Sequence, residues 1–407
     1  LFRSYYWNIS SNMDLKTTPK YMDKRGFQLS NQFRFMTKNQ RGETLLDFLP
    51  NDKQTDKDRT YISHEQVVNL SSDWKLSLKG EYASGNNYFE DLTQTLSSTS
   101  RTHLVRSINL DHFSNNWFLN IGMDNHQIIN YAMLFDEKPH KRLPYLNFTG
   151  LWSLKETGIN YGLNGQLAYF DKSGAASGGR FHMMPNISKT FNLNGIQVKP
   201  ALEIDITKYN LDKGSDEETS RFKAKRTVPI YSLDVNALLK KSWSNQSYQQ
   251  TIEPRIMAVY IPFHDQNDFP VFDTIQPDIN HIQLFRKNRY IGQDRIGDTS
   301  KLSYGITTKL FEKSSLEPFM SLTLGQTHYY KERKVTLPNE LVNNNNSSAY
   351  LAMMKWNISK EWSLRLGHMW ASDIDQSMKT ETRLQYKSNN AKIFNFSYRY
   401  RRDMLRQ

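Results

Sequence analysis

The stretch Ile159–Tyr169 reads INYGLNGQLAY, and its apolar side chains stand two positions apart. They are Ile159, Tyr161, Leu163, Leu167 and Tyr169, and Asn160, Asn164, Gln166 and Ala168 lie between them. Successive side chains of a β-strand point to opposite faces of the sheet. A period of two therefore predicts a strand with one apolar and one polar face.

The same alternation recurs along the chain, over Trp74–Tyr82, Ile196–Ile206, Leu302–Leu310 and Phe394–Tyr400. No charge-free apolar run reaches the length of about 18 residues that a membrane helix needs. The repetition predicts an all-β fold, in which residues 1–407 form one domain built on a large antiparallel sheet.

Composition favours a transmembrane β-barrel. The chain has 407 residues, of which 38% are hydrophobic and 13% aromatic. Its mean hydropathy is −0.70, whereas a soluble protein of this size normally buries more aliphatic side chains. Alternating strands of roughly ten residues with aromatic ends are typical of such barrels, and the chain length predicts roughly 18 to 20 strands.

A soluble β-sandwich array or propeller is the alternative to the membrane barrel. Such folds show a fixed repeat with recurring turn motifs, and this sequence has none. The barrel is therefore the favoured fold.

The net charge of +12 predicts anionic surroundings such as lipid phosphate or an acidic partner. The basic residues are dispersed, which disfavours nucleic acid as a partner. The chain has no cysteine, so these residues form no disulfide. No cleavable signal precedes the first predicted strand, and no terminal aromatic closes the last, so we expect an internal fragment of a longer protein.

One segment, Pro262–Arg295, lacks clean alternation and contains three prolines. Connections this long are usually functional or disordered. This one is rich in Phe, Ile and Leu, which disordered segments lack. We therefore expect it to pack against the inner barrel wall or against a partner in the lumen.

No motif indicates catalysis, a metal site or a cofactor. The chain has no His-Glu-x-x-His pair, no nucleophile elbow and no phosphate-binding loop. His264, Asp265 and Asp268 do not make a metal-ligand set, and we interpret Asp294 and Asp298 around Arg295 as a salt-bridged structural cluster. The sequence favours a conduit over an enzyme. A barrel hydrolase stays open as an alternative, with a Ser/His or Asp/His pair assembled by folding.

Two dense stretches carry a family resemblance. The first is Tyr5-Tyr6-Trp7-Asn8-Ile9 with Thr18-Pro19-Lys20-Tyr21-Met22, and the second runs from Glu253-Pro254-Arg255 through Tyr260-Ile261-Pro262-Phe263 to Gly292-Gln293-Asp294-Arg295-Ile296-Gly297-Asp298. Both resemble LptD, the family of outer-membrane lipopolysaccharide translocons, and the resemblance spans nearly the whole chain in order.

The resemblance implies a barrel of roughly two dozen strands in the outer membrane of a Gram-negative bacterium. In this family the barrel follows a periplasmic jellyroll that receives lipopolysaccharide from LptA, and an LptE-like lipoprotein plugs its lumen. The sugars pass through the lumen, and the lipid leaves between the first and last strands into the surrounding outer-membrane lipids. This chain would begin at the first barrel strand and lack the jellyroll, the last strands and the family's cysteines.

The resemblance also implies two sets of site residues. A lateral gate would include Ser4, Tyr5, Tyr6, Trp7, Asn8 and Pro19. Proline removes a donor from the ladder, and Ser4 stands where the family often has a second proline. The lumenal loop that contacts the plug would include Pro262, Asp265, Gln266, Phe269, Phe272, Asp273, Arg289, Asp294, Arg295 and Asp298.

A general outer-membrane porin or transporter barrel is the other alternative. A porin is normally complete and trimeric, and a plugged transporter carries its own N-terminal plug domain. A jellyroll preceding these residues in the parent protein would favour the translocon.

Overall fold

The structure is a computed structural model. It describes residues 4–92, 101–130, 138–212, 224–242, 248–277, 281–312, 315, 317–342, 344–371, 374–388 and 392–402. The Ser/Thr-rich stretch 92–102 and the charged stretch 212–225, whose composition predicts loops, lie mostly outside these residues.

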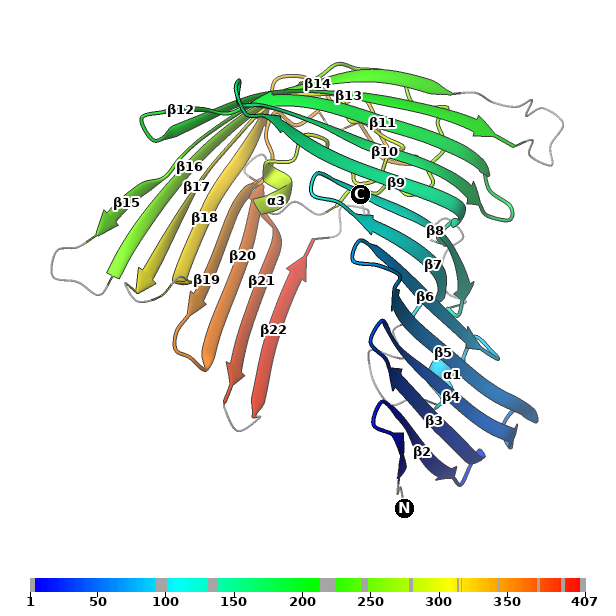
Figure 1. Ribbon diagram of the computed structural model, residues 1–407. Coiled ribbons are helices and arrows are strands. Elements are labelled where there is room, and N and C mark those ends of the chain that lie inside the picture. The colour runs from blue at the N-terminus through cyan, green and yellow to red at the C-terminus, as the bar shows by residue number, and fades with distance from the viewer. Residues whose placement is uncertain are drawn as a thin grey trace. The chain divides into compact units, whose positions relative to one another are not determined.

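The described residues are almost entirely β-strand, which confirms the predicted fold class (Figure 1). The strands are β1 (Tyr5–Ser10), β2 (Met13–Met22), β3 (Gly26–Met36), β4 (Gln40–Asp52), β5 (Lys57–Asn69), β6 (Trp74–Ala83), β7 (His103–Phe113), β8 (Trp117–Ile128), β9 (Lys141–Leu154), β10 (Ile159–Asp171), β11 (Gly178–Lys189), β12 (Phe191–Leu193), β13 (Ile196–Leu211), β14 (Lys225–Ala237), β15 (Leu239–Ser242), β16 (Tyr248–Ile261), β17 (Thr299–Glu312), β18 (Pro318–Tyr329), β19 (Tyr350–Asn357), β20 (Trp362–Ala371), β21 (Gln376–Lys387) and β22 (Ile393–Arg401). The helices are α1 (Tyr88–Leu92) and α3 (His281–Leu284).

All 22 of these strands belong to one hydrogen-bonded sheet. Two of them continue a neighbour across a one-residue break, because β11 and β12 both pair with β13, and β14 and β15 both pair with β16. Counting each interrupted pair once leaves 22 − 2 = 20 strands in the described chain, which agrees with the predicted range.

The chain divides into two compact units, which we describe separately. Unit 1 comprises residues 1–151, 163–183 and 207–225, and unit 2 comprises residues 152–162, 184–206 and 226–407. The assignment of residues 1–407 to a single domain stays a prediction.

The strand β10 exposes apolar side chains and hydrogen-bonds polar ones, which is the reverse of the burial expected in a soluble protein. In β10, Tyr161 is 41% and Leu167 50% exposed. On the opposite face, Gln166 accepts a hydrogen bond from Arg180 Nε at 3.2 Å and donates to Asn147 Oδ1 at 2.8 Å. Arg180 is itself buried. Exposed apolar faces and hydrogen-bonded polar faces suit a wall with lipid on its apolar side.

Within each unit, the connections at one edge of the sheet are all short, whereas those at the other edge range from short ones, such as 23–25 and 53–56, to long segments. In unit 1, the turns at 11–12, 37–39, 70–73 and 114–116 are short, whereas residues 84–102 and 129–140 form long connections. In unit 2, the connections at 358–361 and 388–392 are short, and the opposite edge carries the long connections 262–298 and 330–349 as well as the short one at 372–375. Alternate connections of an antiparallel sheet lie at opposite edges, and outer-membrane barrels place their short turns on the periplasmic side.

In unit 1, ion pairs and apolar contacts hold helix α1 against the strands. Tyr88, Phe89 and Leu92 pack in a buried cluster with Leu49 and Tyr61. Four charged side chains surround this cluster: Arg25 reaches Asp52 at 2.7 Å and Asp91 at 2.9 Å, and Arg59 also reaches Asp91 at 2.9 Å. The described helix of this connection is therefore packed onto strands of its own unit.

Within the described ranges, no helix is long and apolar enough to cross a membrane.

Candidate functional site

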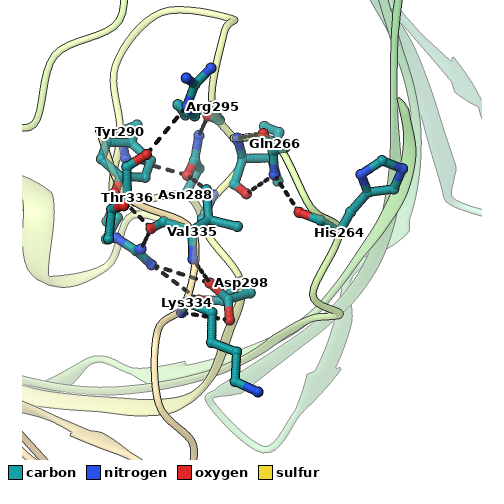
Figure 2. A network of polar contacts seen from close by, with 12 residues as sticks. His264, Gln266, Asn288, Tyr290, Arg295, Asp298, Lys334, Val335 and Thr336 are labelled. Carbon is teal, nitrogen blue, oxygen red and sulfur yellow. Dashed lines mark hydrogen bonds and ion pairs between the residues drawn. The ribbon is translucent and has the colours of Figure 1, made fainter. Parts of the chain in front are cut away.

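The candidate site is built from two connections of unit 2. The inner segment is residues 262–298, between β16 and β17, and the clasp segment is residues 331–342, between β18 and β19. Figure 2 shows the polar contacts that join them.

A pair of glycines explains how the inner segment docks on the wall. Gly305 of β17 and Gly325 of β18 are directly opposite in the ladder. A Cβ at Gly305 would lie 3.2 Å from the Phe285 ring, and a Cβ at Gly325 would overlap the side chain of Leu284. The two glycines therefore form a notch that receives the end of helix α3. The Arg255 guanidinium lies 4.4 Å from the centroid of the Phe285 ring and holds that ring in place.

Apolar packing continues this anchor. Leu284, Phe285 and Ile296 share one buried cluster with side chains of β14 and β16, namely Val228, Ile230, Met257, Val259 and Ile261. Full burial of each large side chain contributes about 1.5–3 kcal/mol. The sequence predicted that this segment packs either against the barrel wall or against a partner. The structure shows it packed against strands of its own sheet.

Arg226, the second residue of β14, connects the inner segment to the strands. Its Nε donates to Asp205 Oδ1 at 2.7 Å, and both side chains are completely buried. Its Nη1 donates to Gln266 Oε1 at 2.9 Å and to the Asp294 carbonyl at 2.7 Å. A buried ion pair is costly to break, because removing one partner leaves the other charge buried without a counter-ion.

Asp294 and Gln266 close the inner segment on itself. Asp294 Oδ2 accepts hydrogen bonds from the backbone N–H of Phe272 at 2.8 Å and of Asp273 at 2.9 Å. Gln266 accepts from the N–H of Ile296 at 3.0 Å and donates to its carbonyl at 2.8 Å. These contacts replace the ladder that the segment lacks.

Arg295 joins both segments through carbonyl oxygens. It donates to Phe269 O at 2.8 Å, to Pro270 O at 3.0 Å and to Thr336 O of the clasp segment at 3.3 Å. These contacts of Arg295 are structural, and they are made to carbonyl oxygens. The salt bridges predicted between Arg295 and the two aspartates stay a prediction.

The clasp segment is held by Asp298 and Tyr290 (Figure 2) and also by Arg289. Asp298 accepts from the N–H of Val335 at 2.9 Å and of Lys334 at 3.0 Å. The carbonyl of Val335 in turn accepts from Arg289 and lies 2.9 Å from the Tyr290 hydroxyl. Burial raises the pKa of Tyr290 to about 12, so its phenol stays protonated at neutral pH.

The predicted plug-contact residues fall into three classes of burial. Asp265 and Asp273 are exposed, Pro262, Phe269 and Arg289 are half-buried, and Gln266, Phe272, Asp294, Arg295 and Asp298 are buried. The five buried residues make contacts within the inner segment or with the clasp segment. Contact between this segment and a plug lipoprotein stays a prediction. Such a contact would involve the exposed residues of the inner segment.

Arg226, Gly305, Gly325 and the clasp segment were not among the predicted site residues. Arg226 sits in an ordinary strand pattern, and its partners are distant in sequence. The two glycines carried a weak signal, because glycine inside a strand marks a close approach of another group.

The predicted gate residues lie on the first two strands of unit 1. β1 pairs with β2 from Tyr5 opposite Thr17 to Ser10 opposite Met13, and the register shifts between Asn8 and Ser10. The remaining predicted gate residues of β1 are Tyr6 and Trp7, which pair with Lys16 and Leu15.

Ser4 and Pro19 flank the end of this ladder. Ser4 Oγ lies 3.0 Å from Thr18 Oγ1. Pro19 is beyond the β1 pairing and is opposite Leu29 of β3. Tyr5 is 67% exposed. The ladder of β1 is therefore short and irregular.

Among the residues that the structure describes, no three His, Asp or Glu side chains lie close enough together to hold a metal ion.

Comparison with known proteins gives consistent matches. The family model "LptD: LPS transport system D" matches residues 57–407. The LPS-assembly protein LptD of Nitrosococcus oceani is 30% identical over 99% of this chain and 55% of its own length. That of Aromatoleum aromaticum is 30% identical over 98% of this chain and 51% of its own length.

The chain thus spans about half the length of the curated relatives it matches. A solved structure, Pseudomonas aeruginosa OccK2 in complex with glucuronate, covers 95% of this chain at 9% identity and a TM-score of 0.31, which is too low to carry an argument.

Proposed function

Because this chain belongs to the LPS transport system D family, LptD, we propose that the complete protein inserts lipopolysaccharide into the outer leaflet of the outer membrane. The match of the family model to residues 57–407 is the observation that carries this proposal. The chain is a β-barrel protein of the outer membrane.

The two faces of the strands suit this task. The apolar faces suit contact with acyl chains, and the polar faces suit contact with sugars and their charged groups. A substrate with an apolar and a polar part needs both environments in one wall.

We propose that β1 forms one side of a lateral exit. The strand β1 has six residues and β2 has ten, so the ladder between them is short. A register shift also interrupts this ladder. Pro19 has no N–H to donate at the position just beyond that ladder. A weak ladder opens at a lower free-energy cost than a continuous one.

We further propose that the exposed surface of the inner segment docks an LptE-like lipoprotein. Asp265 and Asp273 lie on this surface, beside the exposed apolar side chains Phe263 and Ile275. LptA would bind a domain outside these residues. A photo-crosslinker at Asn267, which is exposed, should capture the lipoprotein, whereas one at the buried Phe272 should not.

Replacing the wild-type protein in cells by a crosslinked full-length form tests the function. Cells that express only a form with β1 crosslinked to the last strand should lose newly made lipopolysaccharide from their surface, and a reducible crosslink should restore it on reduction. A porin or transporter predicts unchanged surface lipopolysaccharide and altered solute uptake. Unchanged surface lipopolysaccharide with β1 locked would refute the exit proposal.

A further inference from the structure

Unit 1 pairs the charges on its polar face. A row of side chains directly opposite one another crosses β2 to β6, namely Asp14, Arg34, Glu43, Glu65 and Lys79. Arg34 binds Asp14 with two hydrogen bonds of 2.9 Å, and Lys79 reaches Glu65 at 2.7 Å. The cations of this row thus have carboxylate partners on the neighbouring strands.

Unit 2 has a row of the opposite kind. Lys355 of β19 is opposite Arg365 of β20, which is opposite Arg383 of β21. All three side chains are exposed, and we call them the basic strip. Like charges directly opposite one another destabilise a sheet. Within the described ranges, the structure gives none of the three an ion pair or a hydrogen bond.

The surrounding face does not neutralise the basic strip. The charged residues that share this face of β19 to β22 are Lys355, Arg365, Lys379, Arg383, Lys387, Arg399 and Arg401, with Glu381 as the carboxylate. Glu381 is engaged by Lys379 at 3.2 Å and by Arg399 at 2.9 Å. The described face therefore carries a large positive surplus beside the basic strip.

The spacing of the strip indicates the kind of ligand. Neighbouring strands lie about 4.8 Å apart, so three adjacent strands place their cations along about 10 Å. Guanidinium groups bind phosphate and carboxylate oxygens in a bidentate manner, and lysine supplies a point charge. A row of this length suits a molecule with several oxyanion groups better than a single small anion.

We propose that the basic strip, Lys355, Arg365 and Arg383, is a binding site for the phosphate groups of the transported lipopolysaccharide. This inference rests on the proposed function and assigns a chemical group of the substrate to named residues. The strip lies near the short turn at 358–361, on the polar face where the sugar-phosphate part of the substrate would pass.

The test compares two triple variants of the full-length protein in its complex. One is Lys355→Gln/Arg365→Gln/Arg383→Gln. The control is Lys24→Gln/Lys38→Gln/Lys155→Gln, which removes the same charge from exposed lysines in short turns. Heat-modifiable migration in gels verifies that each variant is folded. Binding is measured with phosphorylated lipopolysaccharide, with the same lipopolysaccharide after chemical removal of its phosphates, and with inorganic phosphate.

We expect the strip variant to bind phosphorylated lipopolysaccharide about tenfold more weakly, and the control to bind it as the wild type does. Dephosphorylated lipopolysaccharide should bind equally to all three proteins. Arg365→Lys/Arg383→Lys, which keeps the charge but not the fork geometry, should lose less affinity than the strip variant.

Equal affinity of the strip variant and the wild type for the phosphorylated form would overturn the proposal while leaving the transport function intact. Strip-dependent binding of inorganic phosphate, with no preference for phosphorylated lipopolysaccharide, would overturn the assignment to the substrate. A wild-type protein that bound neither form would contradict the proposed function as well.

Discussion

At the scale of single residues, Asp298 links the two connections of the site. It accepts two backbone N–H groups of the clasp segment and is itself buried. Asp298→Ala should open the clasp segment and cost about 1–3 kcal/mol, because the buried N–H of Val335 and the part-buried N–H of Lys334 lose a charged acceptor. Spin labels at Ile275 and Leu341, which are 59% and 88% exposed, report the separation of the two segments.

We expect a narrow distance distribution in the wild type and a broad, longer one in Asp298→Ala. Glu332→Ala is the control, since Glu332 is an exposed residue of the same segment. An unchanged distribution in Asp298→Ala would show that this carboxylate does not hold the clasp.

Tyr290 gives the clasp a dependence on alkaline pH. Its pKa is raised to about 12, above the value of about 10 in an unfolded chain. A raised pKa of this kind contributes stability that is complete below pH 10 and is lost as the pH rises through 12. The distance between labels at Ile275 and Leu341 should therefore broaden between pH 10 and 12.

Tyr290→Phe should remove this broadening, because phenylalanine does not titrate. The same pH profile in Tyr290→Phe and wild type would assign the transition to other groups.

At the scale of elements, the notch at Gly305 and Gly325 determines where helix α3 docks. Gly325→Ala should displace Leu284, because the added methyl group would occupy the position of that side chain. Overpacking of this kind typically costs about 1–3 kcal/mol. Amide hydrogen exchange of residues 281–298 at neutral pH should become faster.

Gly367→Ala in β20 is the matched control, since its Cβ would meet Glu381 at an ordinary 3.9 Å. Equal protection of the inner segment in both variants would contradict the notch as its anchor.

The strands could be predicted from the sequence and the site could not, for a physical reason. Alternation is local, so the pattern around Tyr161 and Leu167 indicates both the strand and its faces. The inner segment could be recognised as packed from its apolar content. Its anchors depend on partners far away in sequence, such as Arg226 with Asp294, and the register that brings Gly305 opposite Gly325 carries no local signal.

At the scale of the whole molecule, the two faces of the sheet meet different surroundings. The polar face carries hydrogen-bonded and charged side chains in both units, with paired charges in unit 1 and the unneutralised basic strip in unit 2. The apolar face carries exposed aromatic and aliphatic side chains. Such a distribution is stable only where lipid covers the apolar face.

The most direct test of this claim is the accessibility of spin labels placed singly along β10 from Ile159 to Leu167, in the full-length protein reconstituted into lipid. We expect accessibility to repeat every two residues. Labels at Tyr161, Leu163 and Leu167 should be accessible to oxygen dissolved in the bilayer, and labels at Asn160, Asn164 and Gln166 should be accessible to a water-soluble relaxation agent. Uniform accessibility along the strand, or a period of 3.6, would contradict this expectation.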